Sequence, residues 1–133
     1  MTKYLTENQI IALNKRVIER YSIGEEIRLV SPSALNMIVN LPEQYLFGNQ
    51  LYPTLVDKAT ILFVQLVKKH VFANGNKRTA FLVLNLFLNL NHVRLVVKKE
   101  EAIDFTVKVA VEPLTEETLS SYRDWLSEHI FQK

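Results

Sequence analysis

HVFANGNKRTAF, residues 70–81, joins two apolar helical patterns through a connector that is too polar to belong to a protein core. We predict that a helix begins near Asn76, so that the free N–H groups of its first turn face the connector. Lys77 and Arg78 add full positive charge to that partial charge. Residues 70–78, here named the anion loop, are therefore predicted to bind an anion. His70 places beside it a side chain that titrates near neutral pH.

Composition predicts one domain, residues 1–133, because 48% of the residues are hydrophobic and glycine and proline are few. Cysteine is absent, which excludes disulfides, thiolate zinc sites and cysteine nucleophiles. The N-terminal residues lack the apolar run of a signal peptide, and the most apolar segment, residues 81–90, is short and interrupted by asparagines. We expect a cytoplasmic protein with no membrane partner.

Basic residues are unevenly distributed, although the net charge is only +2. Residues 58–99 contain eight lysines and arginines and no aspartate or glutamate. The pairs Lys68-Lys69 and Lys98-Lys99 are expected on solvated helix faces. Lys77-Arg78 differs, because it follows Gly-Asn at a predicted helix start, where both side chains and the backbone would attract a phosphate.

Hydrophobic periodicity predicts an all-α bundle of about six helices with one small β-hairpin. The fourth helix is apolar nearly all round, which is typical of a helix at the centre of a bundle. Residues 92–97 are expected to form a short strand or an extended connector. The expected helices lie between a cap at Thr6 or Asn8 and Gly24, from Pro32 to Val39, from Thr54 to Lys69, and at residues 76–91, 100–111 and 115–131.

A lone histidine at a helix end usually caps carbonyl groups, and we expect this role for His92 and His129. His70 differs because of the residues that follow it. Phe72 is predicted to point inward, and Gly75 to approach a phosphate closely or to adopt a positive φ. A base beside a phosphate cradle is the arrangement that phosphoryl or nucleotidyl transfer requires. The spacing matches neither a Walker loop nor a zinc-binding helix.

Residues 70–80 read H-V-F-x-x-G-N-K-R-T-A and resemble the signature of the Fic/Doc superfamily, in particular its Doc (death-on-curing) toxin branch. Fic enzymes have His-Pro-Phe-x-Asp/Glu-Gly-Asn-Gly-Arg-x-x-Arg, whereas Doc proteins have Asn-Lys-Arg-Thr-Ala. The resemblance extends over most of the chain. It implies a Fic-like helical bundle with a hairpin flap before the central helix-loop-helix.

The resemblance also implies roles for single residues. His70 would be the general base that accepts the proton of a target hydroxyl, and Arg78 would neutralise charge that develops during transfer. Lys77 replaces the glycine of AMP-transferring enzymes and Phe81 replaces their second arginine, as in the Doc branch, which implies transfer of the γ-phosphate of ATP. The implied catalytic residues are His70, Lys77 and Arg78, and the implied nucleotide-binding residues are Asn74, Gly75, Asn76, Lys77 and Arg78.

Asn74 departs from the family pattern, because it occupies the position of the Asp or Glu expected to hold Mg²⁺. A neutral amide oxygen is a much poorer ligand for this hard cation. Asp57, Glu43 or the nucleotide itself would have to help. The identity of the metal ligands therefore stays open. Asn76 is predicted to cap its own helix and also to contact phosphate oxygens.

Partners follow from the same resemblance. It implies a toxin of a type II toxin-antitoxin system, inhibited in trans by an antitoxin of the Phd kind, that arrests translation by modifying elongation factor Tu. A hairpin flap would align the target segment by strand addition, the alternative being a plain surface hairpin. The flap is predicted to turn at Gly48-Asn49 and to consist of Tyr45, Leu46, Phe47, Gly48 and Asn49.

Three alternatives are open. The same base could serve AMP transfer, or Asn74 could have produced a protein that binds a nucleotide or partner without catalysis. RNA binding through the basic middle segment is a weaker alternative, because this segment lacks surface aromatic residues that stack on bases. We expect no direct nucleic-acid partner.

Overall fold

The computed structural model describes all 133 residues as six α-helices, one 3-10 helix and four short strands. The predicted all-α bundle with a hairpin is confirmed. The helices are α1 (Glu7–Tyr21), α2 (Pro32–Asn40), α3 (Leu55–Lys68), α4 (Asn76–Leu90), α5 (Lys99–Val111) and α6 (Glu116–His129), with the 3-10 helix at Leu41–Glu43. The strands are β1 (Tyr45–Leu46), β2 (Asn49–Gln50), β3 (Val93–Leu95) and β4 (Ile130–Gln132).

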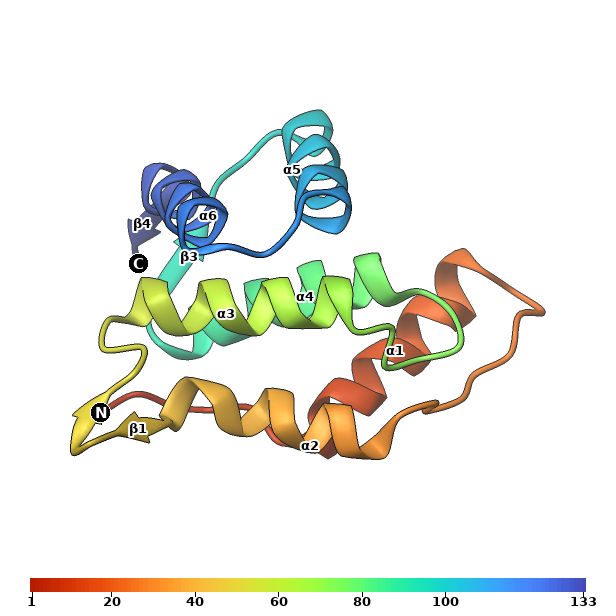
Figure 1. Ribbon diagram of the computed structural model, residues 1–133. Coiled ribbons are helices and arrows are strands. Elements are labelled where there is room, and N and C mark those ends of the chain that lie inside the picture. Colours follow the sequence, from red (N-terminus) through yellow and green to blue (C-terminus); the bar gives the residue numbers. More distant parts are fainter.

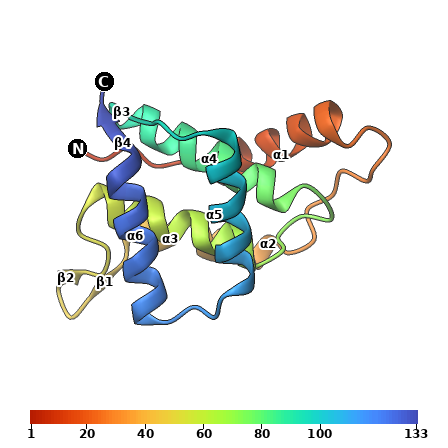
Figure 2. The same ribbon diagram turned by 90° about the horizontal axis from the view of Figure 1, so that it is seen from above.

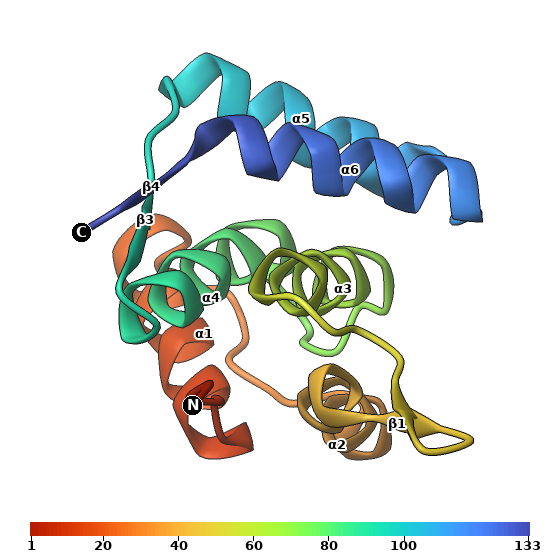
Figure 3. The same cartoon turned by 90° about the vertical axis from the view of Figure 1, so that its left-hand side faces the viewer.

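The helices form three layers (Figure 1). α3 and α4 lie in the middle, α5 and α6 cover one side, and α1 and α2 cover the other, as the end-on view in Figure 3 also shows. Phe63 of α3, Phe87 of α4 and Tyr122 of α6 are the largest fully buried side chains. The predicted central position of α4 is confirmed. No helix has the length and apolar character that a membrane span requires.

Side-chain caps begin four of the helices, and the cap predicted at Thr6 or Asn8 is formed by Thr6. Thr6, Ser31, Thr54 and Thr115 each accept a hydrogen bond from the backbone N–H three residues later. Each cap satisfies one of the N–H groups that a helix leaves unpaired, and stabilises the protein by about 1 kcal/mol. These caps therefore fix the starts of α1, α2, α3 and α6.

Two predictions about strands are wrong. The hairpin turns at Phe47-Gly48, which both have positive φ (49° and 81°), whereas Asn49 lies in β2 opposite Leu46. The last helix ends at His129 rather than Phe131, because the next three residues pair with β3 as an antiparallel strand. The strand predicted within residues 92–97 thus obtains its partner from the far end of the chain.

Polar side chains close the ends of the outer helices. Lys68 is not solvated as predicted, because its Nζ donates to the carbonyl oxygens of Val109 (3.0 Å) and Glu112 (2.6 Å). The Tyr122 hydroxyl donates to Glu112 Oε1 (2.7 Å), and burial together with this bond raises the pKa of Tyr122 to about 12. His129 caps the Trp125 carbonyl (2.6 Å), as predicted. His92 instead ends α4 through its backbone, with a φ of 63°.

Both chain ends attach to the turn between α4 and β3. The Asn91 side chain exchanges two hydrogen bonds with the Lys3 backbone (2.8 and 2.9 Å). The Lys133 N–H donates to the His92 carbonyl (3.1 Å). Figure 2 shows both termini at one end of the bundle and the connection from α3 to α4 at the other. The anion loop is therefore far from both termini.

Candidate active site

The anion loop connects the C-terminal end of α3 to the start of α4 (Figure 1). His70 follows the last turn of α3 with a φ of 47°, a left-handed conformation that ends the helix. The His70 side chain is exposed, whereas Val71 and Phe72 are buried. The inward Phe72 is thus confirmed, and the buried pair anchors the backbone that presents the imidazole to solvent.

The connection between α1 and α2 pins the loop through backbone hydrogen bonds. The Val71 carbonyl accepts from Val30 (2.8 Å) and Ser31 (3.1 Å), and the Ala73 N–H donates to the Arg28 carbonyl (3.0 Å). Backbone bonds hold a position more stiffly than long side chains can. The segment after His70 therefore has a fixed path.

The Asn76 side chain closes the loop on itself. Its Oδ1 accepts from the Phe72 N–H (3.0 Å) and its Nδ2 donates to the Phe72 carbonyl (2.8 Å). The predicted helix start at Asn76 is confirmed, but its predicted capping role is wrong, since Gly75 is the N-cap residue and no side chain caps α4. The Asn76 amide shapes the loop, which leaves its backbone N–H to face an anion.

Three backbone donors at the start of α4 are unpaired. The first bonded N–H group of this helix is that of Thr79, which donates to the Gly75 carbonyl (2.9 Å). The N–H groups of Asn76, Lys77 and Arg78 therefore have no acceptor in the structure, and they lie at the positive end of a 15-residue helix. The exposed side chains of Lys77 and Arg78 add two charges. This arrangement favours binding of a phosphate.

Gly75 packs directly on α1. It has a φ of 72°, and a Cβ atom there would lie 2.9 Å from Ile18 Cδ1 and 3.1 Å from Val17 Cγ1. The predicted positive φ is confirmed, and the close neighbour is a helix of the same chain. Both the backbone conformation and this contact favour glycine.

Asn14 of α1 also holds the loop, and the sequence predictions missed it. Its side chain is only 2% exposed, and Nδ2 donates to the Asn74 carbonyl (2.9 Å) and to Thr79 Oγ1 (3.1 Å). One amide thus joins the loop to the first turn of α4. The available signal was a polar residue on the apolar face that carries Ile10 and Val17.

The residues around Asn74 do not fit a Mg²⁺ site. Asn74 Nδ2 donates to the Glu26 carbonyl (3.0 Å), so the side chain acts as a tether to the connection after α1. Asp57, one of the predicted helpers, lies in the first turn of α3, at the opposite end of that helix, and pairs with Arg123 (3.4 Å). Glu43 lies next to the hairpin at the same distant end. No group of three or more His, Cys, Asp or Glu side chains in the chain is arranged so that it could hold a metal ion.

A groove of about 550 Å³ begins at the anion loop and runs between α4 and α5. Phe81 is one wall and packs edge-on against Phe63, with ring centroids 6.4 Å apart. The groove is mainly apolar with three basic side chains. It is lined by Tyr21, Lys77, Arg78, Phe81, Leu82, Val97, Lys99, Ala102, Ile103, Thr106 and Val107.

The structure does not bring the hairpin to the anion loop. The hairpin precedes α3 and the loop follows it, so the two lie at opposite ends of a 14-residue helix, which is about 20 Å long (Figure 1). Phe47, at the tip, is 94% exposed. Of the predicted site residues, His70 and Asn74–Arg78 lie together and Tyr45–Asn49 lie apart. Target docking by the hairpin stays a prediction.

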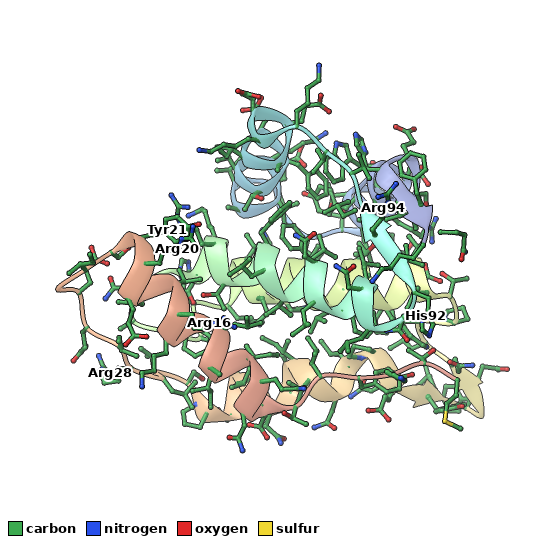
Figure 4. All side chains as sticks on the ribbon, turned by 180° about the vertical axis from the view of Figure 1, so that it is seen from behind. Arg16, Arg20, Tyr21, Arg28, His92 and Arg94 are labelled. Atoms are coloured by element: carbon green, nitrogen blue, oxygen red, sulfur yellow. The ribbon has the colours of Figure 1, made fainter.

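The basic side chains of residues 58–99 do not all lie near the anion loop. Figure 4 shows Arg20 at the end of α1 and Arg28 on the following connection, while Arg94 lies toward the other end of the bundle. Lys58 is buried and donates to Gln50 Oε1 (2.8 Å) and to the Tyr52 carbonyl. Lys77, Arg78 and Lys99 of this segment lie together in the groove, and RNA binding through the segment stays an alternative.

The sequence is similar to those of known proteins. The model of the Fic/DOC family matches residues 4–88, which include α1, the anion loop and most of α4. Toxin Doc of Mycolicibacterium smegmatis is 31% identical over 116 residues, which cover 87% of this chain and 81% of that protein. The chain belongs to the Fic/DOC family.

Membership of the Fic/DOC family confirms the resemblance drawn from residues 70–80. The matched residues also contain the parts of α1 that contact the loop, Asn14, Val17 and Ile18. The family match and the loop geometry thus concern the same part of the molecule.

Gly75→Ala is expected to lower the free energy of unfolding by about 2–4 kcal/mol, because it adds left-handed strain to an overpacked contact with α1. Gly48→Ala is the matched control, since Gly48 has a similar φ of 81° but no atom within 4 Å of the added Cβ. The strain alone should lower the free energy of unfolding of Gly48→Ala by about 1–2 kcal/mol. Urea unfolding of both variants measures the difference, and equal losses would contradict the role of α1.

Proposed function

We propose that this protein is the toxin of a toxin-antitoxin pair and transfers the γ-phosphate of ATP to a hydroxyl group of a protein. The observation that carries this proposal is the exposed His70 in the same rigid loop as the unpaired N–H groups and cations of α4. The similarity of the chain to Toxin Doc supports the assignment as a toxin. We propose elongation factor Tu as the target, with arrest of translation as the result, in the cytoplasm.

The proposed reaction uses residues of the loop directly. The His70 imidazole accepts the proton of the target hydroxyl as its oxygen attacks the γ-phosphorus. The bond from the γ-phosphorus to the bridging β–γ oxygen breaks, and ADP leaves with that electron pair. The free N–H groups of α4 with Lys77 and Arg78 stabilise the charge on the phosphoryl oxygens. Because the residues near Asn74 do not fit Mg²⁺, no step is assigned to a metal.

AMP transfer is the enzymatic alternative, and two side chains favour phosphate transfer over it. Lys77 places bulk and charge where AMP-transferring relatives have glycine. Phe81 packs against Phe63 and presents no cation to a distal phosphate. In AMP transfer the target oxygen would attack the α-phosphorus and pyrophosphate would leave, so the product masses differ.

His70→Ala is expected to reduce target modification by about 100-fold or more, because the general base is lost. The assay incubates purified protein with ATP and a cell lysate or elongation factor Tu, and measures the mass added to the target. His92→Ala is the matched control, since His92 is also exposed and follows a helix with positive φ. One phosphate is expected. One AMP would support the alternative, and activity unchanged in His70→Ala would refute both reactions.

Nucleotide binding without catalysis is the second candidate function. It is favoured by Asn74, whose amide is tethered to the Glu26 carbonyl where relatives have a metal-binding carboxylate. In such a protein the helix start and the two cations would hold the phosphates without a divalent ion. Affinity for ATP would then be insensitive to Mg²⁺.

Asn74→Asp tests this second candidate by calorimetry of ATP binding, with Mg²⁺ or with EDTA. We expect the wild-type protein to bind ATP equally well in both conditions, because its anion site contains no carboxylate. The variant should bind ATP more weakly in EDTA, because the new carboxylate repels the phosphates of ATP. Its affinity for ATP should recover in Mg²⁺, which can bridge the carboxylate and a phosphate. Metal-dependent ATP binding with turnover in the wild-type protein would reject the binding-only function.

We propose an antitoxin of the Phd kind as the partner and the groove between α4 and α5 as its docking surface. Ile103 and Val107 of α5 and Leu82 of α4 are exposed apolar side chains in this groove. Lys77, Arg78 and Lys99 provide positive charge around them. An amphipathic helical segment with acidic residues has the complementary chemistry.

Ile103→Lys is expected to keep cells arrested even when the antitoxin is co-expressed, because a charge in the groove weakens binding on the order of ten-fold or more. Val111→Lys is the matched control, as Val111 lies on the same helix, is 74% exposed and is outside the groove. Growth with and without the antitoxin measures rescue. Rescue of both variants to the same extent would place the antitoxin elsewhere.

A further inference from the structure

Arg78 contacts an aromatic ring and no acidic partner. Its Cζ lies 4.1 Å from the centroid of the Tyr21 ring, well within the range of a cation–π interaction. The ion pairs of the chain are Arg28 with Glu26, Arg123 with Asp57 and His129 with Glu101. The charge of Arg78 is therefore not neutralised by a carboxylate.

An aromatic partner and a carboxylate would affect this arginine differently. A carboxylate would accept two of the five N–H donors of the guanidinium and would cancel its charge. An aromatic face contacts the flat side of the group and leaves the donors at its edge free. Arg78 can thus be held in place and still bind two oxygens of an anion.

Tyr21 is placed by the same face of α1 that holds the anion loop. Asn14, Val17, Ile18 and Tyr21 are spaced by three or four residues, so they share one side of the helix. The first three contact the loop backbone or Gly75. Figure 4 shows Tyr21 at the end of α1, beside the start of α4, with Arg20 next to it.

We propose that Tyr21 is a positioning residue that holds the Arg78 guanidinium at the anion loop with its N–H donors free. This inference rests on the proposed function, in which Arg78 stabilises the transferring phosphate. A solvent-exposed arginine would otherwise have to lose side-chain freedom each time it met the transition state. The stack orders the side chain beforehand.

The test compares Tyr21→Leu, Tyr21→Phe, Arg78→Ala and the double variant Tyr21→Leu/Arg78→Ala with the wild-type protein. Tyr21→Leu is expected to lower kcat about five-fold, the size of one cation–π contact, with KM for ATP nearly unchanged. Tyr21→Phe keeps the ring and should recover most of the rate. In the Arg78→Ala background, Tyr21→Leu should have no further effect. Equal thermal unfolding midpoints confirm that the variants are folded.

Three results would overturn the inference. Tyr21→Leu could have the wild-type kcat, or Tyr21→Phe could be as slow as Tyr21→Leu. In the third, Tyr21→Leu lowers kcat by the same factor in the Arg78→Ala background as in the wild-type protein. Failure of the proposed function is a separate outcome, seen as no transfer by the wild-type protein. The same proteins are then compared by their affinity for ATP. Weaker binding in Tyr21→Leu only where Arg78 is present supports the positioning role, and no such dependence refutes it.

Discussion

The contact of Gly75 with Val17 and Ile18 is the constraint on which the site depends. It sets the distance between α1 and the start of α4, and a Cβ atom at residue 75 would lie 2.9 Å from Ile18 Cδ1 and force a shift. Asn14 then bonds to both the loop and α4. Because α4 is the buried centre of the bundle, the first turn that carries the site has little freedom to move.

Polar side chains of the loop build its shape, and its backbone and cations provide the binding groups. The amides of Asn76 and Asn74 are used in bonds to Phe72 and Glu26. The unpaired N–H groups and the charges of Lys77 and Arg78 remain available to a ligand. A site made in this way needs no reorganisation to receive an anion, and this is what phosphoryl transfer requires of a protein.

Local patterns were sufficient to predict much of this structure. The positions of the helices follow from apolar periodicity and from a cap such as Thr6, and the position of the candidate site follows from the composition of residues 70–78. The errors concern contacts between distant segments. β4 leaves the last helix to pair with β3, and Lys68 reaches the end of α5. Asn14 and Tyr21 acquire their roles only when α1 packs on the loop, which no local pattern reveals.

Compared with an Asp or Glu at the same position, Asn74 alters the charge of the loop as well as its capacity to bind a metal ion. A carboxylate about 4 Å from a phosphate charge would be repelled by roughly 4 kcal/mol at an effective dielectric constant of 20, unless a divalent cation joined the two. An uncharged amide removes this repulsion, and the tether from Asn74 to Glu26 retains the shape of the loop. The loop itself contains no carboxylate, so none of its own side chains opposes the action of the unpaired donors of α4 and the two cations on a phosphate. The amide at the position where the family resemblance implies a metal ligand therefore also reduces the need for a cation.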